Sequence, residues 1–212
     1  MTPGLFAACA ARPGIGLGEL ALALAAEFGP ADSAGVMHEL EVLALELRGA
    51  ELLAPRYQLE ALGGVMTAFR PVRDPLRRRP LMLDAVLRDR AGDPAVLAVL
   101  ATDVARRAGL DVAIAGDGDR YVVAHRRGNR PLVLALDAPG GRVQMVHPHS
   151  MAWCCPHQMV SFLIGELLER ARRVGDVSAA IHAAELRLAL PLNGRARLAM
   201  RAELAAVRAG LN

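Results

Sequence analysis

The chain of 212 residues contains no lysine, so all 25 of its basic residues are arginine. A P-loop and Schiff-base catalysis both require a lysine, and both are therefore excluded. Aromatic residues make up only 3% of the chain, which argues against the stacking surfaces of single-stranded nucleic acid binders. The net charge of +3 is small for this length and gives no indication of a nucleic acid or membrane partner.

Cysteine is scarce, with Cys9, Cys154 and Cys155 the three present. Adjacent cysteines rarely pair with each other, so a disulfide framework is not expected. No apolar run reaches membrane-spanning length without a charge, and the N-terminus lacks the basic start of a signal peptide. The sequence therefore predicts a cytoplasmic protein with reduced thiols.

Hydrophobic residues form 53% of the chain, enough for one core built mainly from leucine, alanine and valine. Apolar periodicity and capping residues predict helices over 18–28, 32–48, 57–69, 81–90, 94–108, 156–174, 176–190 and 194–210. Valine-rich segments between turn residues predict strands at 111–115, 120–127, 132–137 and 142–147. Strands in succession with short turns indicate an antiparallel sheet, so the predicted fold class is α+β.

The helix that begins at Pro94 has apolar residues on several faces, and we expect it to be central and buried. Asp93 is the expected N-cap, and Pro94 suits the first turn, where its missing N–H costs nothing. Gly109 is expected to follow the last turn.

This order of elements resembles the papain and transglutaminase core, in which a buried helix opening at the equivalent of 92–94 is followed by strands. Residues 83–110 resemble the Sir-B family of bacterial transglutaminase-like proteins, and residues 135–141 (ALDAPGG) resemble its aspartate turn. Residues 24–47 also fit, and residues 167–190 resemble the tetratricopeptide-type extension of that family.

The resemblance implies two parts of the chain. A helical lead-in and a papain- or transglutaminase-like core, with the buried helix on a small antiparallel sheet, are expected over residues 1–153. A helical hairpin tail of the tetratricopeptide type is expected over residues 154–212, packed on the core.

The resemblance also places the catalytic positions of the family. Pro94 stands where catalytic relatives carry the nucleophilic cysteine, Arg120 stands at the histidine, and Asp137 retains the aspartate. Proline has no nucleophile and arginine stays protonated at neutral pH, so neither can fill the family role. The resemblance thus implies a non-catalytic accessory protein without a cofactor. It would bind a protein or peptide in the groove around these residues, with Arg120 and Asp137 forming an ion pair.

A second hypothesis, that of an enzyme with a relocated centre, rests on a cluster of imidazoles and thiols. Its members are His147, His149, Cys154, Cys155 and His157. Zinc and softer ions prefer these ligands, so a metal site is one interpretation. Another is a thiol hydrolase or transferase in which Cys154 or Cys155 acts near Asp137 and His157. A cysteine at a helix start has a lowered pKa, and Pro156 indicates such a start.

Ordinary packing is the favoured explanation of the same cluster. Free cysteine is among the most buried residue types. We therefore expect Trp153 and Cys155 to pack under the helical tail, with the histidines at the edge of the sheet.

The stretch 70–80 is expected to be a loop, because three prolines and five arginines leave it no periodicity. The arginines are Arg70, Arg73, Arg77, Arg78 and Arg79. They could meet an acidic partner or a phosphate, and a solvated loop is the alternative.

Overall fold

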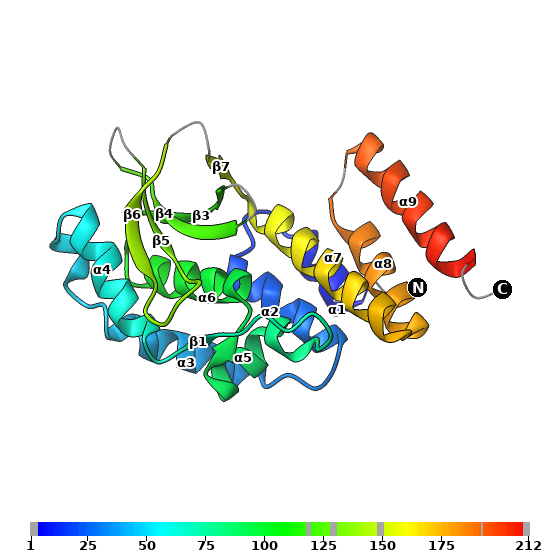
Figure 1. Ribbon diagram of the computed structural model, residues 1–212, viewed down its shortest axis with the longest axis horizontal. Helices are drawn as coiled ribbons and strands as arrows, with labels where there is room; N and C mark the ends of the chain where they lie inside the picture. Colours follow the sequence, from blue (N-terminus) through cyan, green and yellow to red (C-terminus); the bar gives the residue numbers. More distant parts are fainter. Residues whose placement is uncertain (1–3, 118–119, 128–130, 148–150, 192, 210–212) are drawn as a thin grey trace.

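The computed structural model describes residues 4–117, 120–127, 131–147, 151–191 and 193–209. It has the predicted α+β architecture, with N-terminal helices, a five-stranded antiparallel sheet and three C-terminal helices (Figure 1). The helices are α1 (Leu5–Ala10), α2 (Leu17–Glu27), α3 (Ser33–Leu45), α4 (Pro55–Met66), α5 (Leu83–Asp89), α6 (Pro94–Arg107), α7 (Pro156–Val174), α8 (Val177–Ala189) and α9 (Gly194–Ala209). Residue 210, the predicted end of α9, lies outside the described residues. No described helix is both long and apolar enough to cross a membrane.

The five-stranded sheet has the order β6-β5-β4-β3-β7 with antiparallel neighbours. Its strands are β3 (Val112–Asp117), β4 (Arg120–His125), β5 (Leu132–Ala135), β6 (Arg142–Met145) and β7 (Met151–Trp153). β3 to β6 form the predicted meander. The sequence does not predict β7, because three residues are too few to show a period. The chain therefore passes from one edge of the sheet to the other between β6 and β7.

A short parallel bridge lies outside this sheet. β1 (Arg70–Pro71) pairs with β2 (Ala91–Gly92), with Arg70 opposite Ala91. The stretch predicted to be a loop thus begins as a strand, and its end forms a 3-10 turn over Arg79–Leu81. Another 3-10 turn covers Ala50–Leu52, between α3 and α4.

Helix α6 lies at the centre of the protein, as predicted. Every residue from 95 to 105 is buried, and α6 packs on β3 and β4 and also contacts α2, α3 and α5. Asp93 caps its start, since its Oδ1 accepts a hydrogen bond from the backbone N–H of Ala95 at 3.0 Å. Each buried Val or Leu side chain contributes about 2 kcal/mol, so this helix is a major source of the stability of the core.

The other face of the sheet buries small side chains. They are Ala115, Val122, Ala124, Val133 and Ala135. Val146 and Met151, from the two ends of the segment that joins β6 to β7, pack against this cluster. Val146 and Met151 therefore help to cover this face of the sheet.

Glycines allow α4 to approach the turn after β5. A Cβ on Gly63 would lie 2.7 Å from the carbonyl oxygen of Gly140, and Gly140 itself has a φ of +70°. The glycine that weakens the helix in terms of propensity is thus required by the contact between helix and turn.

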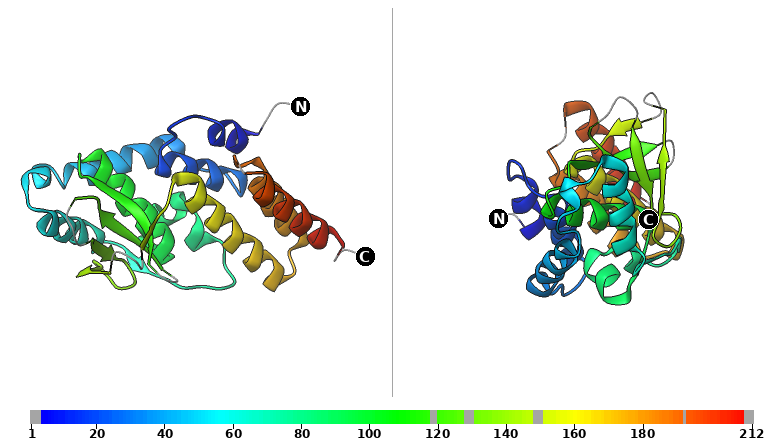
Figure 2. Two further views of the ribbon diagram at one scale, coloured as in Figure 1. Left: turned by 90° about the horizontal axis from the view of Figure 1, so that it is seen from above. Right: turned by 90° about the vertical axis from the view of Figure 1, so that its left-hand side faces the viewer.

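The C-terminal helices extend the molecule along its long axis (Figure 2). α7 packs on α2, α8 on α7, and α9 on α8. The buried face of α7 belongs to the same core cluster as α2 and α6. The division into a core at 1–153 and a tail at 154–212 stays a prediction.

One buried histidine links α4 to the sheet. His125 is 2% exposed, and its Nδ1 accepts a hydrogen bond from the backbone N–H of Arg127 at 3.0 Å. Its Nε2 therefore carries the proton and donates to Oε1 of Gln58 at 2.9 Å. The amide of Gln58 in turn donates to the carbonyls of Leu53 at 2.8 Å and Glu51 at 3.2 Å. Burial lowers the pKa of His125 below its ordinary value of 6.5.

This network predicts a pH-dependent stability. Below about pH 6.5 the unfolded chain takes up a proton on His125 that the folded protein does not, so the free energy of unfolding should fall as the pH drops. The slope from this one group is limited to about 1.4 kcal/mol per pH unit. Urea denaturation at about pH 7.5 and about pH 5.5 measures it. His125→Gln should lose this part of the slope, and exposed His38, changed to glutamine, should keep it. An equal slope in both variants would contradict the assignment.

Candidate functional site

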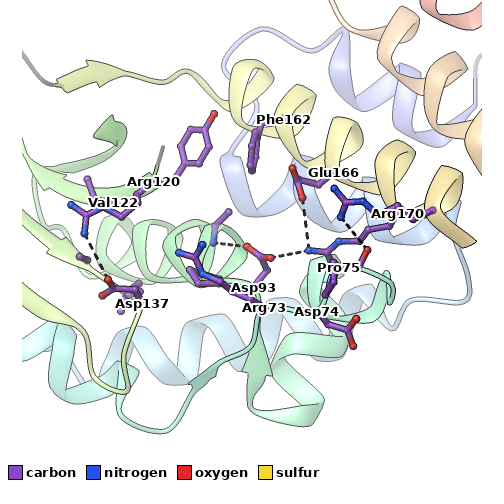
Figure 3. A pocket seen from close by; sticks show the side chains of 16 residues that line it. Arg73, Asp74, Pro75, Asp93, Arg120, Val122, Asp137, Phe162, Glu166 and Arg170 are labelled. Carbon is purple, nitrogen blue, oxygen red and sulfur yellow. Dashed lines mark hydrogen bonds and ion pairs between the residues drawn. The ribbon is translucent and has the colours of Figure 1, made fainter. Parts of the chain in front are cut away.

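A groove of about 440 Å³ opens at the N-terminus of α6 (Figure 3). The ends of β4 and β5, the loop after β1 and one side of α7 form its walls. Pro94, Arg120 and Asp137 all line it. The structure thus brings together the three positions that the sequence resemblance singled out.

Arg120 and Asp137 form the predicted ion pair. The register that pairs Val123 of β4 with Leu134 of β5 places Arg120 opposite Asp137. Nη1 of Arg120 lies 3.7 Å from Oδ2 of Asp137, and both side chains are about one-third exposed. Such a solvated pair contributes at most about 1 kcal/mol. It shapes the wall of the groove more than it stabilises the fold.

The start of α6 is held by a buried arginine from α7. Arg170 is only 3% exposed, and its Nη2 donates to Oδ2 of Asp93 at 2.9 Å. Its Nη1 donates to the carbonyl of Arg77 at 2.7 Å, and Glu166 lies 3.9 Å away. Both carboxylate oxygens of Asp93 therefore have partners at the helix start, one in Arg170 and one in the N–H of Ala95.

Sequence reasoning missed Arg170 and its role in the groove. The available signal was its position seven residues after Leu163 and three after Leu167, on the apolar face of α7. A charged residue at such a position needs a buried partner. The sequence does not say that this partner is Asp93.

Two aromatic rings form an apolar wall of the groove. Tyr121 and Phe162 both line it, with ring centroids 4.5 Å apart and an interplanar angle of 51°. Burial raises the pKa of the Tyr121 hydroxyl. A side chain that entered the groove would meet this wall on one side and the charged residues on the other.

The family model of the transglutaminase-like superfamily matches residues 34–147, more than half of the 212 residues. This chain belongs to the transglutaminase-like superfamily. All three predicted catalytic positions of this transglutaminase-like chain lie within the matched range. The residues that α7 contributes to the groove lie outside the matched range: Phe162, Glu166, Arg170 and Arg173.

One solved structure similar to this transglutaminase-like chain is a crystal structure of menin that reveals the binding site for Mixed Lineage Leukemia (MLL) protein. The TM-score is 0.56 at 14% sequence identity, and the match covers 97% of this chain and 60% of the menin chain. This transglutaminase-like chain therefore spans about three-fifths of menin. At this identity the similarity concerns the fold alone. A search of curated protein sequences found no match.

The predicted cluster of histidines and cysteines lies around the start of α7. Cys155 is exposed and caps this helix, with its backbone N–H donating to Oε1 of Gln158 at 2.9 Å. Cys154 is half-buried, its thiol donates to the carbonyl of Ala152 at 3.5 Å, and burial raises its pKa. Trp153 is 51% exposed. The expectation that Trp153 and Cys155 pack under the tail is therefore wrong.

Two of the three histidines of the cluster, His147 and His157, lie within the described residues. His157 lies with Nε2 2.9 Å from the carbonyl of Ala10 in α1. His147 is exposed after β6, and His149 lies outside the described residues. Within the described part of the chain, no three His, Cys, Asp or Glu side chains form a group that could hold a metal ion. A zinc site that includes His149 stays a prediction.

The two adjacent thiols should differ in reactivity. Cys155 is exposed, whereas burial of Cys154 raises its pKa and lowers its thiolate fraction. We expect iodoacetamide to alkylate Cys155 several-fold faster than Cys154 near neutral pH, as followed by peptide mass spectrometry. Urea should abolish the difference. Faster alkylation of Cys154 in the folded protein would contradict this assignment.

Arg170 should be essential for stability. Arg170→Met leaves the carboxylate of Asp93 and the carbonyl of Arg77 without their buried donor, at a cost of about 3 kcal/mol. The matched control is Arg172→Gln on the exposed side of the same helix, which should cost less than about 0.5 kcal/mol. Urea denaturation measures both. Adding Asp93→Asn to Arg170→Met should recover part of the loss, and strict additivity of the two changes would contradict direct coupling.

Proposed function

We propose that this chain is a non-catalytic, Sir-B-type member of the transglutaminase-like superfamily, and that it binds a segment of another protein in the groove at the start of α6. In this proposal its C-terminal helices form a tetratricopeptide-type tail, and it acts in the cytoplasm as an accessory module without a cofactor. The observation that carries the proposal is that the protein has a groove at the start of α6, although Pro94 stands where catalytic relatives carry the nucleophile.

The lining chemistry of the groove supports binding over catalysis. The described lining residues include no cysteine, serine, threonine, histidine or lysine. The acyl-enzyme of a transglutaminase-type reaction is a thioester or ester, which forms on a cysteine, serine or threonine that a base such as histidine activates. The polar side chains that are present, apart from Tyr121, are arginines and carboxylates.

The size and the rigid walls of the groove also suit a bound ligand. Its volume of about 440 Å³ falls in the usual range of ligand pockets and can accept a few side chains. The buried contact between Arg170 and Asp93 fixes α7 against the start of α6. Two walls from distant parts of the sequence are therefore held in place before any ligand binds, which lowers the entropic cost of binding.

The alternative is a thiol hydrolase or transferase at the start of α7. One observation favours it: the thiol of Cys155 is exposed to solvent at the N-cap of a helix of 19 residues. Neither Cys154, Cys155 nor His157 lines the groove with Asp137. Such an enzyme would therefore need an acid or base other than Asp137.

Photo-cross-linking tests the proposed function. A benzoylphenylalanine residue in place of Phe162 lies in the groove, and one in place of Leu198 lies on α9, where that leucine is 68% exposed. In the native host, position 162 should give a discrete cross-linked partner that position 198 does not, as identified by mass spectrometry. Equal cross-linking at both positions, or none at 162, would contradict binding in the groove. Retained cross-linking in a Cys154→Ala, Cys155→Ala background would separate this binding from thiol chemistry.

A further inference from the structure

The charges of the groove are unequally neutralised within the protein. Four carboxylates line it: Asp74, Asp93, Asp137 and Glu166. Asp93 and Glu166 face Arg170, and Asp137 faces Arg120. Asp74 accepts hydrogen bonds from the backbone N–H groups of Leu76 and Arg77, at 2.9 and 3.0 Å, which lower its pKa. Each negative charge of the groove is therefore already engaged.

Two of the four lining arginines have no carboxylate partner among the described residues. Arg173 is exposed on α7 and donates to the neutral carbonyl of Pro75 at 3.4 Å. Arg73 is exposed on the loop after β1 and makes no hydrogen bond or ion pair within the described part of the chain. The groove thus offers a ligand two positive charges that the protein does not neutralise.

These two guanidinium groups come from two walls of the groove, the loop after β1 and α7, which the hydrogen bond from Arg173 to Pro75 joins. Figure 3 shows Arg73 between the Arg120–Asp137 pair and Asp93. Arg173 belongs to the helix that also contributes Phe162 to the apolar wall. The groove therefore carries two guanidinium groups without a carboxylate partner among the described residues, and Tyr121 and Phe162 give its lining an aromatic surface.

We propose that the groove selects an acidic segment of its partner protein, in which carboxylates flank an apolar or aromatic side chain. This inference rests on the proposed function and names the chemistry of its ligand. The carboxylates pair with Arg73 and Arg173, since a guanidinium presents parallel donors that match a carboxylate. The apolar side chain packs on Tyr121 and Phe162. A basic segment would place like charges together in the groove and is disfavoured.

A peptide uses more of the groove than a small anion does. A free dicarboxylate or phosphate would meet the two exposed arginines but would leave the aromatic wall in contact with water. Pairing with exposed arginines alone is weak, because water screens it. The combination of apolar burial and charge is what gives a peptide useful affinity in this site.

Peptide display tests the inference without knowledge of the natural partner. A phage library of random dodecapeptides is selected on the full chain and, in parallel, on the double variant Arg73→Gln, Arg173→Gln. The matched control is Arg78→Gln, Arg172→Gln, which removes the same charge from the same loop and the same helix outside the groove. Synthetic peptides of the enriched sequences are then measured by fluorescence anisotropy at low and high salt, with succinate and inorganic phosphate as competitors.

We expect the full chain to enrich peptides with aspartate or glutamate beside an apolar residue. Their affinity should fall roughly tenfold in the groove variant, stay within about twofold in the control variant and weaken with salt. Enrichment of neutral or basic peptides, indifferent to Arg73 and Arg173, would overturn the acidic specificity and leave the proposed function standing. Succinate or phosphate binding as tightly as the peptides would assign the site to small anions. No enrichment at all would count against both proposals.

Discussion

The buried contact between Arg170 and Asp93 is the interaction on which the arrangement of this protein depends. It joins the second turn from the end of α7 to the N-cap of the central helix α6, across 77 positions of sequence. The same guanidinium holds the carbonyl of Arg77, so the loop after β1 is fixed by the same side chain. Three separate segments therefore meet at one desolvated charge, and the groove is the space that remains beside it.

The protein keeps the shape of a transglutaminase-like site, but two of the three family positions carry different residues, Pro94 and Arg120. The helix start, the strand pair and the aspartate turn are all present, and they bring Pro94, Arg120 and Asp137 to one groove. At two of these positions the structure shows what the residue does: Pro94 begins the helix, and Arg120 forms an ion pair with Asp137. Function in such a fold resides in the residues of the site and not in the scaffold.

The sequence was sufficient for elements with a clear period or cap. Asp93 and Pro94 marked the start of α6, and the resemblance placed Arg120 beside Asp137 before the sheet register was known. It was insufficient where an element is short or a contact is distant. β7 has three residues and no pattern of its own, and α1 has six. The wall made by α7 depends on Arg170 meeting Asp93, and no local pattern encodes that meeting. Trp153 was misplaced because composition suggests burial while an edge strand leaves its ring in solvent.

The path of the chain between β6 and β7 has a consequence for synthesis on the ribosome. β3 is complete at residue 117, but its outer edge is paired only by β7, which begins at residue 151. A nascent chain thus carries β3 with one row of backbone donors and acceptors open, and such an edge invites pairing with other chains. The ion pair between Asp93 and Arg170 likewise cannot form until residue 170 has been synthesised. The first half of the protein therefore lacks partners for the edge of β3 and for Asp93. Both partners come from the last third of the sequence, so the nascent chain is exposed to aggregation until that part is made.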